Sequence, residues 1–470
     1  MAKQSINIGS SANDGTGDTI RAGMDKVNDN FTEIYAVNGG SAAFPSLGSA
    51  GQILQVNSGA SALEFAAAST VIPHKIEGTN FTGSILIGHS TVSGFLSSAE
   101  NNTGVGIGAL DALAQGDDNV AVGKNAGTAL VNGSGNIAIG SSALAAEDAN
   151  GGNTAVGFES LKVQDAGADG HNVAIGYQAG VAVSTGVDNV IIGSGAGDAV
   201  NSGARNVLIG RNAGGALTAS SDTIAIGDDA LSTLVGGSAN IAIGHEALLA
   251  YARTNSPGEE GDIAIGHEAG KTMGGAGSVS KFVLLGYQAG KVMTRSGASN
   301  STVIGYQAGV AITSGNSNTI IGSNAGDALE TGDNNIIIGH GAAASSTSVD
   351  NEITLGDGSI ATIRAQVTSI SSLSDKRDKK DIKDSVYGLN FVDSLKPVTF
   401  EWDQRDGNRS GVKDVGFIAQ DLQEVDDEYT RLVYESNPER LEATYGRLIP
   451  IMAKAIQELS AKVKQLESKK

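Results

Sequence analysis

The chain has 470 residues, of which 66 are glycine and only 4% are aromatic. Isolated globular cores need more bulky side chains than this, so we expect most burial between stacked repeats and between chains. The formal net charge of −20 argues against nucleic acid as a partner, and the absence of cysteine excludes disulfides and thiolate metal sites. We expect no cofactor and no bound metal. No apolar run approaches the ~20 residues of a membrane span, and the first residues lack the apolar core of a secretory signal.

Residues 1–38 begin with a polar, turn-rich lead and continue as a predicted short helix. Asp18 is the expected N-cap, and apolar residues then recur at spacings of 4, 3, 4 and 3, as in a short coiled-coil seam. These residues are Ile20, Met24, Val27, Phe31 and Ile34. The stretch Ala12-Asn-Asp-Gly-Thr-Gly-Asp18, before a helix ending near Asn30-Phe-Thr-Glu-Ile-Tyr35, resembles the N-terminal part of phage tail and fibre proteins. This resemblance implies that the segment attaches to the virion; the alternative is a helix that only caps the repeats that follow.

Residues 39–83 read as a connector of small and polar residues that contains Pro45 and Pro73. Within it, the stretch from Gly51 to Phe65 alternates apolar and polar side chains, which predicts a β-hairpin. Similar segments recur in phage fibres.

From residue 84 to residue 372 the chain is organised by sixteen short motifs that end in an aliphatic residue and a glycine. The anchoring glycines stand at positions 88, 108, 123, 140, 157, 176, 193, 210, 227, 244, 266, 286, 305, 322, 339 and 356. Nine of the fifteen intervals are 17 residues, and this period predicts a mainly β fold, a β-roll or β-solenoid shaft with one coil per repeat. The longer loops at 251–260 and 271–281 are interpreted either as loops that recognise a ligand or as simple variation in repeat length.

Each motif predicts a four-residue strand that is apolar on both faces. The residue before the glycine is aliphatic, and two residues earlier stands Ile, Val or Thr. The position between them carries Ala in seven copies and Leu, Ile or Val in seven others. A strand that is apolar on both faces needs an apolar surface on each side. We assign the flanking residues to the coil interior and the middle residues, such as Ala138 and Ala174, to a contact with another copy of the chain, because Ala permits close approach.

The Asn-x-Ala-Ile-Gly-x-x-Ala pattern, as in Asn136-Ile-Ala-Ile-Gly140, resembles the head repeats of trimeric autotransporter adhesins and similar repeats in phage tail fibres. The adhesin repeats form trimeric β-rolls, so the resemblance implies a trimeric shaft. A bacterial adhesin is the less favoured source, because such a protein needs a secretory signal and a membrane anchor and we recognise neither in this sequence.

Composition changes after Ser372, where charged residues crowd together and the only tryptophan, Trp402, appears. We expect a separate α+β module over residues 374–470, with helices at 384–395 and 420–425 and strands at 398–402 and 415–419. The last part repeats apolar residues at spacings of 3 and 4, the a and d positions of a coiled coil of about three heptads. These residues are Ile449, Met452, Ile456, Leu459, Val463 and Leu466.

The module opens with the one segment that carries chemistry, Ser374-Asp-Lys-Arg-Asp-Lys379. A serine hydroxyl and a lysine five residues later can form a Ser-Lys dyad when neighbouring cations or loss of water hold the lysine neutral. Lys376, Arg377 and Lys380 supply such cations. On spacing alone, the alternative is a Ser-Asp pair that caps a charged turn.

Motifs along the last 97 residues resemble, in order, the endosialidase-type intramolecular chaperone. They are Ser374-Asp-Lys-Arg-Asp-Lys379, Leu395-Lys-Pro-Val-Thr-Phe-Glu-Trp402, Val415-Gly-Phe-Ile-Ala-Gln-Asp-Leu-Gln-Glu-Val425 and Tyr445-Gly-Arg-Leu-Ile-Pro450. The resemblance implies a trimeric module that helps the preceding fibre fold and then cuts itself off. It further implies that Ser374 is the nucleophile, Lys379 the base and Leu373-Ser374 the cleaved bond, with Asp375 and Arg377 in supporting roles. Asp378 stands where an apolar residue is commoner, and a carboxylate beside the base favours its protonated form.

Together the resemblances imply a homotrimeric phage tail fibre that is made in the host cytoplasm and assembled into the virion. Expected partners are two further copies of the chain, a phage tail or baseplate protein at the N-terminus, and a host surface receptor, either a glycan or an outer-membrane component.

Two alternatives concern side chains on the shaft. A glycan-depolymerising tailspike would use carboxylates, and the shaft carries Asp198, Asp229, Glu246 and Glu268, but we see no aromatic platforms for sugars. Histidines follow the motif glycine at positions 89, 245, 267 and 340; they either line a trimer axis around an ion, or simply face solvent or stack.

Overall fold

The structure is a computed structural model, and it describes residues 52–56, 63–67, 74–76, 82–88, 97–250, 261–273, 281–294, 299–360, 362–364, 366, 374–405 and 410–469. The predicted N-terminal helix, Leu373 and His89 lie outside these residues. The chain divides into two units, Met1–Glu159 with Gly167–Asp169, and Ser160–Ala166 with Gly170–Lys470.

The first unit contains a hairpin and the first coils of a parallel β-solenoid. Strands β1 (Gln52–Val56) and β2 (Leu63–Ala67) pair antiparallel, which confirms the predicted hairpin. Strand β3 (His74–Ile76) pairs antiparallel with β4 (Ile85–Ile87). From β4 onward each strand pairs in parallel with the next one along the chain. These are β5 (Thr103–Val105), β6 (Val120–Val122), β7 (Ile137–Ile139) and β8 (Thr154–Val156).

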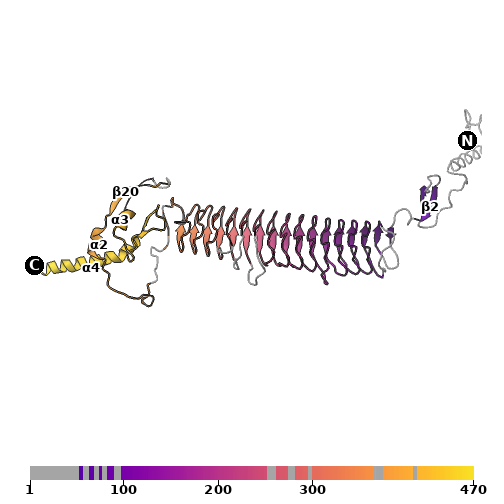
Figure 1. The fold of residues 1–470 in the computed structure, drawn as a ribbon, viewed down its shortest axis with the longest axis horizontal. Helices are drawn as coiled ribbons and strands as arrows, with labels where there is room; N and C mark the ends of the chain where they lie inside the picture. Colours follow the sequence, from indigo (N-terminus) through magenta and orange to yellow (C-terminus); the bar gives the residue numbers. More distant parts are fainter. Residues whose placement is uncertain are drawn as a thin grey trace, which may run out of the picture. The chain divides into compact units, whose positions relative to one another are not determined.

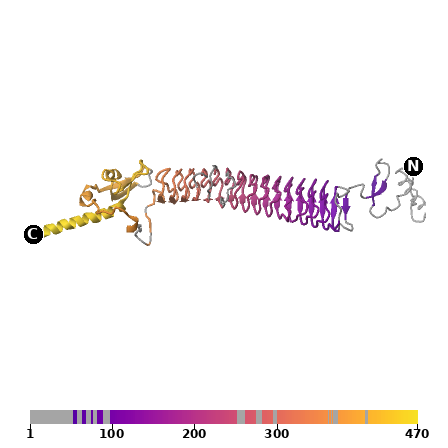
Figure 2. The ribbon, with the colours of Figure 1, turned by 60° about the horizontal axis from the view of Figure 1, so that its bottom comes forward.

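The second unit continues the same architecture with eleven three-residue strands, visible as successive arrows in Figures 1 and 2. Equivalent residues of consecutive coils pair in parallel, for example Ile191 with Leu208. The strands are β9 (Val173–Ile175), β10 (Val190–Ile192), β11 (Val207–Ile209), β12 (Ile224–Ile226), β13 (Ile241–Ile243), β14 (Ile263–Ile265), β15 (Val283–Leu285), β16 (Thr302–Ile304), β17 (Thr319–Ile321), β18 (Ile336–Ile338) and β19 (Ile353–Leu355). The predicted class, mainly β with a solenoid shaft, is confirmed.

One anchoring glycine was assigned wrongly. The second strand ends at Val105, so the equivalent glycine is Gly106 and not Gly108. The chain offers two overlapping Val-Gly and Ile-Gly pairs here, and parallel pairing of Gly104 with Ala121 selects the earlier one. The corrected position brings the interval to Gly123 to the regular 17 residues.

The assignment of the two strand faces was inverted. Middle residues such as Ala138 and Ala174 are fully buried inside the coil of their own chain, whereas the flanking Ile137 and Ile139 remain 37% and 38% exposed. The coil interior already holds a row of alanines such as Ala126 and a second aliphatic row, so two branched side chains per strand have no room there. The flanking residues of successive coils therefore form outward apolar columns.

Buried asparagines form a hydrogen-bonded ladder inside the coils. The side-chain Oδ1 of Asn119 accepts the backbone N–H of Asn136 at 2.9 Å, and its Nδ2 donates to the carbonyl of Gly133 at 2.8 Å. The same pattern recurs in the second unit from Asn189 to Asn206. Because a buried amide without partners is costly, this ladder ties each coil to the next in one register.

The motif glycines are required by close contact between coils. Gly140 has a φ of +135°, which side chains rarely adopt, and a Cβ at this position would overlap the carbonyl oxygen of Gly157 in the next coil. The repeated glycine is therefore a steric consequence of coil stacking.

The C-terminal module combines two small antiparallel sheets with helices. Strand β20 (Val398–Asp403) pairs with β21 (Ser410–Gly416), and β22 (Val433–Tyr434) pairs with β23 (Glu442–Ala443). Helix α2 (Leu389–Ser394) packs against α4 (Leu448–Glu467) (Figure 1), and α3 (Ala419–Gln423) contacts β22 and β23. The core consists of Leu422, Leu432, Val433, Leu448 and Ile451.

The predicted elements of the module are present with shifted ends. The predicted helix 384–395 is shorter, because the Ser385 hydroxyl accepts the Tyr387 N–H in a turn and α2 begins only after Gly388. The predicted strand 415–419 lies earlier, as β21. Among the described residues, no helix is both long enough and apolar enough to cross a membrane.

Candidate functional site

The structure brings the predicted nucleophile and base together. The Nζ of Lys379 lies 2.5 Å from the Oγ of Ser374, a hydrogen-bonding distance across a five-residue turn. The short 3-10 helix η2 (Lys376–Asp378) makes this turn, and Asp375 caps it by accepting the N–H of Arg377 at 2.8 Å. The segment therefore contains both predicted arrangements: Asp375 caps the turn, and Ser374 contacts Lys379.

Asp375 and Arg377 form a second contact beside the dyad. The guanidinium donates Nη2 to Oδ2 of Asp375 at 2.6 Å and Nε at 3.1 Å. The Arg377 side chain holds the pKa of Asp375 below its usual range, and Asp375 in turn raises the pKa of Arg377. Since both side chains are exposed, the pair orients the turn rather than stabilising the fold by much.

In the single chain this segment is open to solvent. Every residue from Ser374 to Asp384 is exposed, and the carbonyl that the serine would attack belongs to Leu373, outside the described residues. The geometry supplies a nucleophile in contact with a potential base. It does not by itself supply the water-free surroundings that keep a lysine neutral.

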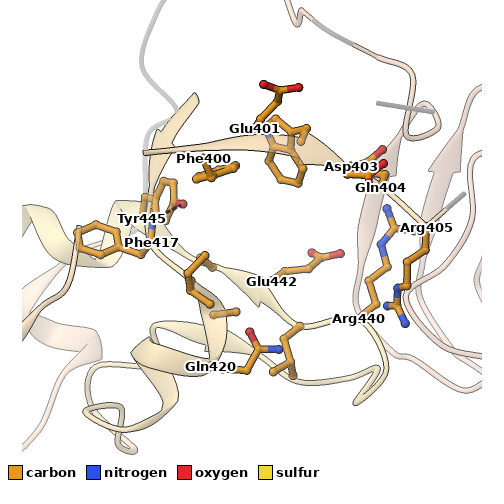
Figure 3. A pocket seen from close by; sticks show the side chains of 15 residues that line it. Phe400, Glu401, Asp403, Gln404, Arg405, Phe417, Gln420, Arg440, Glu442 and Tyr445 are labelled. Carbon is orange, nitrogen blue, oxygen red and sulfur yellow. Dashed lines mark hydrogen bonds between the residues drawn. The ribbon is translucent and has the colours of Figure 1, made fainter. Parts of the chain in front are cut away.

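A hollow of the module lies elsewhere, between β20 and the segment around β23 (Figure 3). It has a volume of about 760 Å³ and contains neither Ser374 nor Lys379. Aromatic rings of Phe400, Phe417 and Tyr445 stand on one side, and Arg405 and Arg440 on another. The segment from Ser374 to Lys379 therefore lies outside this hollow.

Helix α4 has two apolar faces, only one of which is used within the chain. Leu448, Ile451 and Ala455 are buried against the module. The six residues predicted at a and d positions are all between 45% and 66% exposed. They are Ile449, Met452, Ile456, Leu459, Val463 and Leu466. The a and d face thus remains uncovered in the single chain.

The carboxylates considered for glycan hydrolysis are mostly engaged in ion pairs. Glu246 lies 2.5 Å from Lys271, and Asp229 lies 3.1 Å from Arg211. Hydrogen bonds from Lys271, Lys291 and Gln288 hold the pKa of Glu268 far below its usual range, so it cannot serve as a general acid near neutral pH. Burial raises the pKa of Asp198.

The sequence-based view missed an aromatic feature of the shaft. Rings of His245, His267, Tyr287 and Tyr306 stack in consecutive coils, with 5.1 Å between neighbouring centroids. We call these four residues the ring column. The signal is present in the sequence, since all four follow the motif glycine. Stacking is one of the outcomes predicted for the two histidines and is confirmed, whereas the part played by the two tyrosines was not predicted. Within the described residues, no group of three His, Cys, Asp or Glu side chains is placed to hold a metal.

Comparisons with known proteins agree with the resemblances predicted for the N-terminal and C-terminal parts of the chain. Residues 374–433 match the family model described as Chaperone of endosialidase. Residues 3–141 match the model described as Bacteriophage T4 gp9/10-like protein, N-terminal. No curated protein and no solved structure matches the chain.

A β-solenoid that joins these two segments defines a structural protein of the phage tail fibre or tailspike type, a component of the virion tail. More particularly, the chain carries a phage-tail-like N-terminal region and an endosialidase-type chaperone domain at its C-terminal end. The first match extends past residue 38 into the coils, and the second ends before α4. The domain boundaries at 38, 83 and 372 remain predictions.

Proposed function

We propose that the chain is a homotrimeric tail fibre that touches the host surface and is assembled by a C-terminal chaperone that then cleaves itself off. The observation that carries this proposal is the solenoid, lined with outward apolar columns, between a phage-tail-like N-terminal region and an endosialidase-type chaperone segment. The outward columns and the a and d face of α4 are the surfaces that two further copies would cover.

A trimeric fibre of similar repeats has a register problem. Outward side chains such as Ile139, Ile175 and Ile338 are nearly alike from coil to coil, so a slip of one repeat between chains costs little locally. A C-terminal module that trimerises first aligns the three chains before the coils associate. Its removal afterwards leaves the fibre kinetically trapped, because the alignment step cannot be reversed.

The proposed cleavage starts at the Ser374–Lys379 contact. A neutral Lys379 takes the proton from the Ser374 hydroxyl, and Oγ attacks the carbonyl carbon of Leu373. The peptide bond between Leu373 and Ser374 breaks, the proton passes to the freed amine of Ser374, and water hydrolyses the resulting ester. Burial between copies in the trimer would favour the neutral lysine, so cleavage should follow assembly.

Mass spectrometry of the purified protein tests cleavage. The wild type should yield a fragment from Ser374 to Lys470, whereas Ser374→Ala and Lys379→Ala should remain uncut yet trimeric, since neither side chain contributes to the core. Lys383→Ala, an exposed cation nearby, is the matched control and should be cut normally. Intact wild-type chains after prolonged incubation would mean that the module acts without cutting.

Virion attachment is tested separately. Deletion of residues 1–36 should leave trimers that fold but do not join particles, because the proposed anchor is removed while the coils remain. Particles that carry the shortened fibre in normal amounts would place the anchor elsewhere. Native mass of the full-length protein decides the trimer itself, and a stable folded monomer would contradict it.

A further inference from the structure

We propose that the ring column is a binding site for an uncharged glycan chain that runs along the direction in which the coils stack. This inference rests on the proposed function as a host-binding fibre and assigns that function to four coils of the shaft. The site consists of the ring column and the two amide side chains beside it, Gln288 and Gln307.

The geometry of the ring column is regular because the coils pair in register. Strands β13 to β16 place equivalent residues side by side, and the ring residue follows the glycine of each coil. The interplanar angles are 19°, 11° and 9° along the column. All four residues are exposed, Tyr287 at 40% and Tyr306 at 50%. Solvent therefore meets a row of ring edges repeating once per coil.

The charged groups beside the rings are paired with groups of opposite charge. Asp228, whose Oδ2 lies 4.0 Å from Nε2 of His245, pairs with Arg211 at 2.8 Å. Lys271 bridges Glu246 and Glu268 at 2.5 and 2.6 Å, and Lys291 contacts Glu268 at 2.8 Å. Two carboxylates thus face two ammonium groups. In a chain with a net charge of −20, this balanced surface is unsuited to a polyanion or a polycation and suits a neutral ligand.

Amides and ring edges complement hydroxyl groups. Gln288 donates to Glu268 at 2.6 Å, and Gln307 donates to Gln288 at 2.8 Å, which holds both amides beside the rings. Amide, phenol and imidazole groups each donate and accept hydrogen bonds, as sugar hydroxyls do. A saccharide unit in an extended chain advances by a length comparable to one coil. Successive sugars can therefore meet successive coils, which an irregular protein surface cannot do.

The end of the column offers a ring face as well as edges. Most ring faces in the column cover one another, but the coil after Tyr306 carries Ser323 at the equivalent position. The outer face of the Tyr306 ring is therefore free of a further ring and can stack on the C–H face of a sugar. Upstream, the equivalent positions carry Ser194, Arg211 and Asp228, so the site is confined to these four coils.

The test measures binding of labelled full-length fibres to cells of the bacterium on which the phage grows. Tyr287→Ala with Tyr306→Ala should weaken binding at least about tenfold, because exposed tyrosines often dominate binding surfaces. Tyr177→Ala, at the same repeat position in an earlier coil, is the matched control and should bind as wild type. Periodate oxidation of the cells, which destroys glycan diols, should abolish wild-type binding, and protease treatment should not.

Four results would overturn the assignment. Periodate-sensitive binding that the double variant retains would place the glycan site elsewhere. Protease-sensitive, periodate-resistant binding would show a protein receptor. Dissociation of the double variant into monomers would make the column a contact between chains. Absence of wild-type binding to intact cells would remove the host-contact function itself, and is distinguishable from the other three.

Discussion

The backbone N–H of Leu389 donates to the Oε2 atom of Glu458 at 2.8 Å, and this bond pins the first turn of α2 to the middle of α4. The carboxylate satisfies a helix N-terminus that has no side-chain cap of its own. Helix α4 thus completes the fold of the module with one face while its a and d face stays exposed. In the proposed trimer, this one helix would couple folding of the module to association of the chains.

Substitution Gly388→Ala should disrupt the contact between Leu389 and Glu458. A Cβ at Gly388 would overlap the Glu458 carboxylate, so α2 must shift or the hydrogen bond must break. We expect a loss of about 1–3 kcal/mol in the stability of the module, measured by denaturant unfolding of the uncut Ser374→Ala protein. Gly446→Ala is the control, because nothing lies within 4 Å of its added Cβ. Equal stability of the two variants would show that the contact contributes little.

Ala138 and Ile139 are neighbours in β7 and point to opposite faces, Ala138 into the coil and Ile139 outward. Ala138→Glu places a charge among buried groups and should cost on the order of 3 kcal/mol or more, so the shaft should unfold locally. Ile139→Glu puts the same charge on the outward column and should leave coils folded while preventing trimers. Circular dichroism and sedimentation report the two effects separately. Normal trimers of Ile139→Glu would exclude the outward columns as the contact between chains.

Glycine substitutions should differ according to their place in the coil. Gly140→Ala combines an unfavourable φ of +135° with overlap of the next coil, and should lower stability by about 1–3 kcal/mol or more. Gly135 has a φ of +68° with nothing within 4 Å of an added Cβ, and Asn tolerates that conformation. Gly135→Asn should therefore melt within a few degrees of the wild type. A large loss from Gly135→Asn would contradict the steric account.

The ion pairs of Glu268 predict a dependence of stability on pH. Because its pKa in the folded chain is lowered, its contribution is fully present above the unfolded value of about 4.3 and is lost as the pH falls below it. The difference in melting temperature between wild type and Glu268→Gln should therefore shrink on acidification. Glu330→Gln, which changes an exposed carboxylate, should show no such trend. A difference independent of pH would mean that the pairs contribute nothing.

Local features of this protein were readable from its residues. The repeat period, the strand before each motif glycine, the hairpin of β1 and β2 and the final helix all follow from spacing along a short stretch. The Ser374–Lys379 contact is of the same kind, because five residues of chain can bring two side chains together in one turn. Its catalytic role is implied by the resemblance and remains a prediction.

The alternation within each strand is evident from the residues alone, because neighbouring side chains of a strand point to opposite faces and Ala138 must lie opposite Ile137 and Ile139. Which of the two faces is buried required the folded coil, because the width of the coil depends on turns many residues away. The ring column likewise depends on the register between coils. Its successive residues are 19 to 22 positions apart in sequence, because loops of unequal length lie between them. The sequence pattern shows which residues of a strand differ in kind, whereas the stacking of the coils determines which residues contact one another.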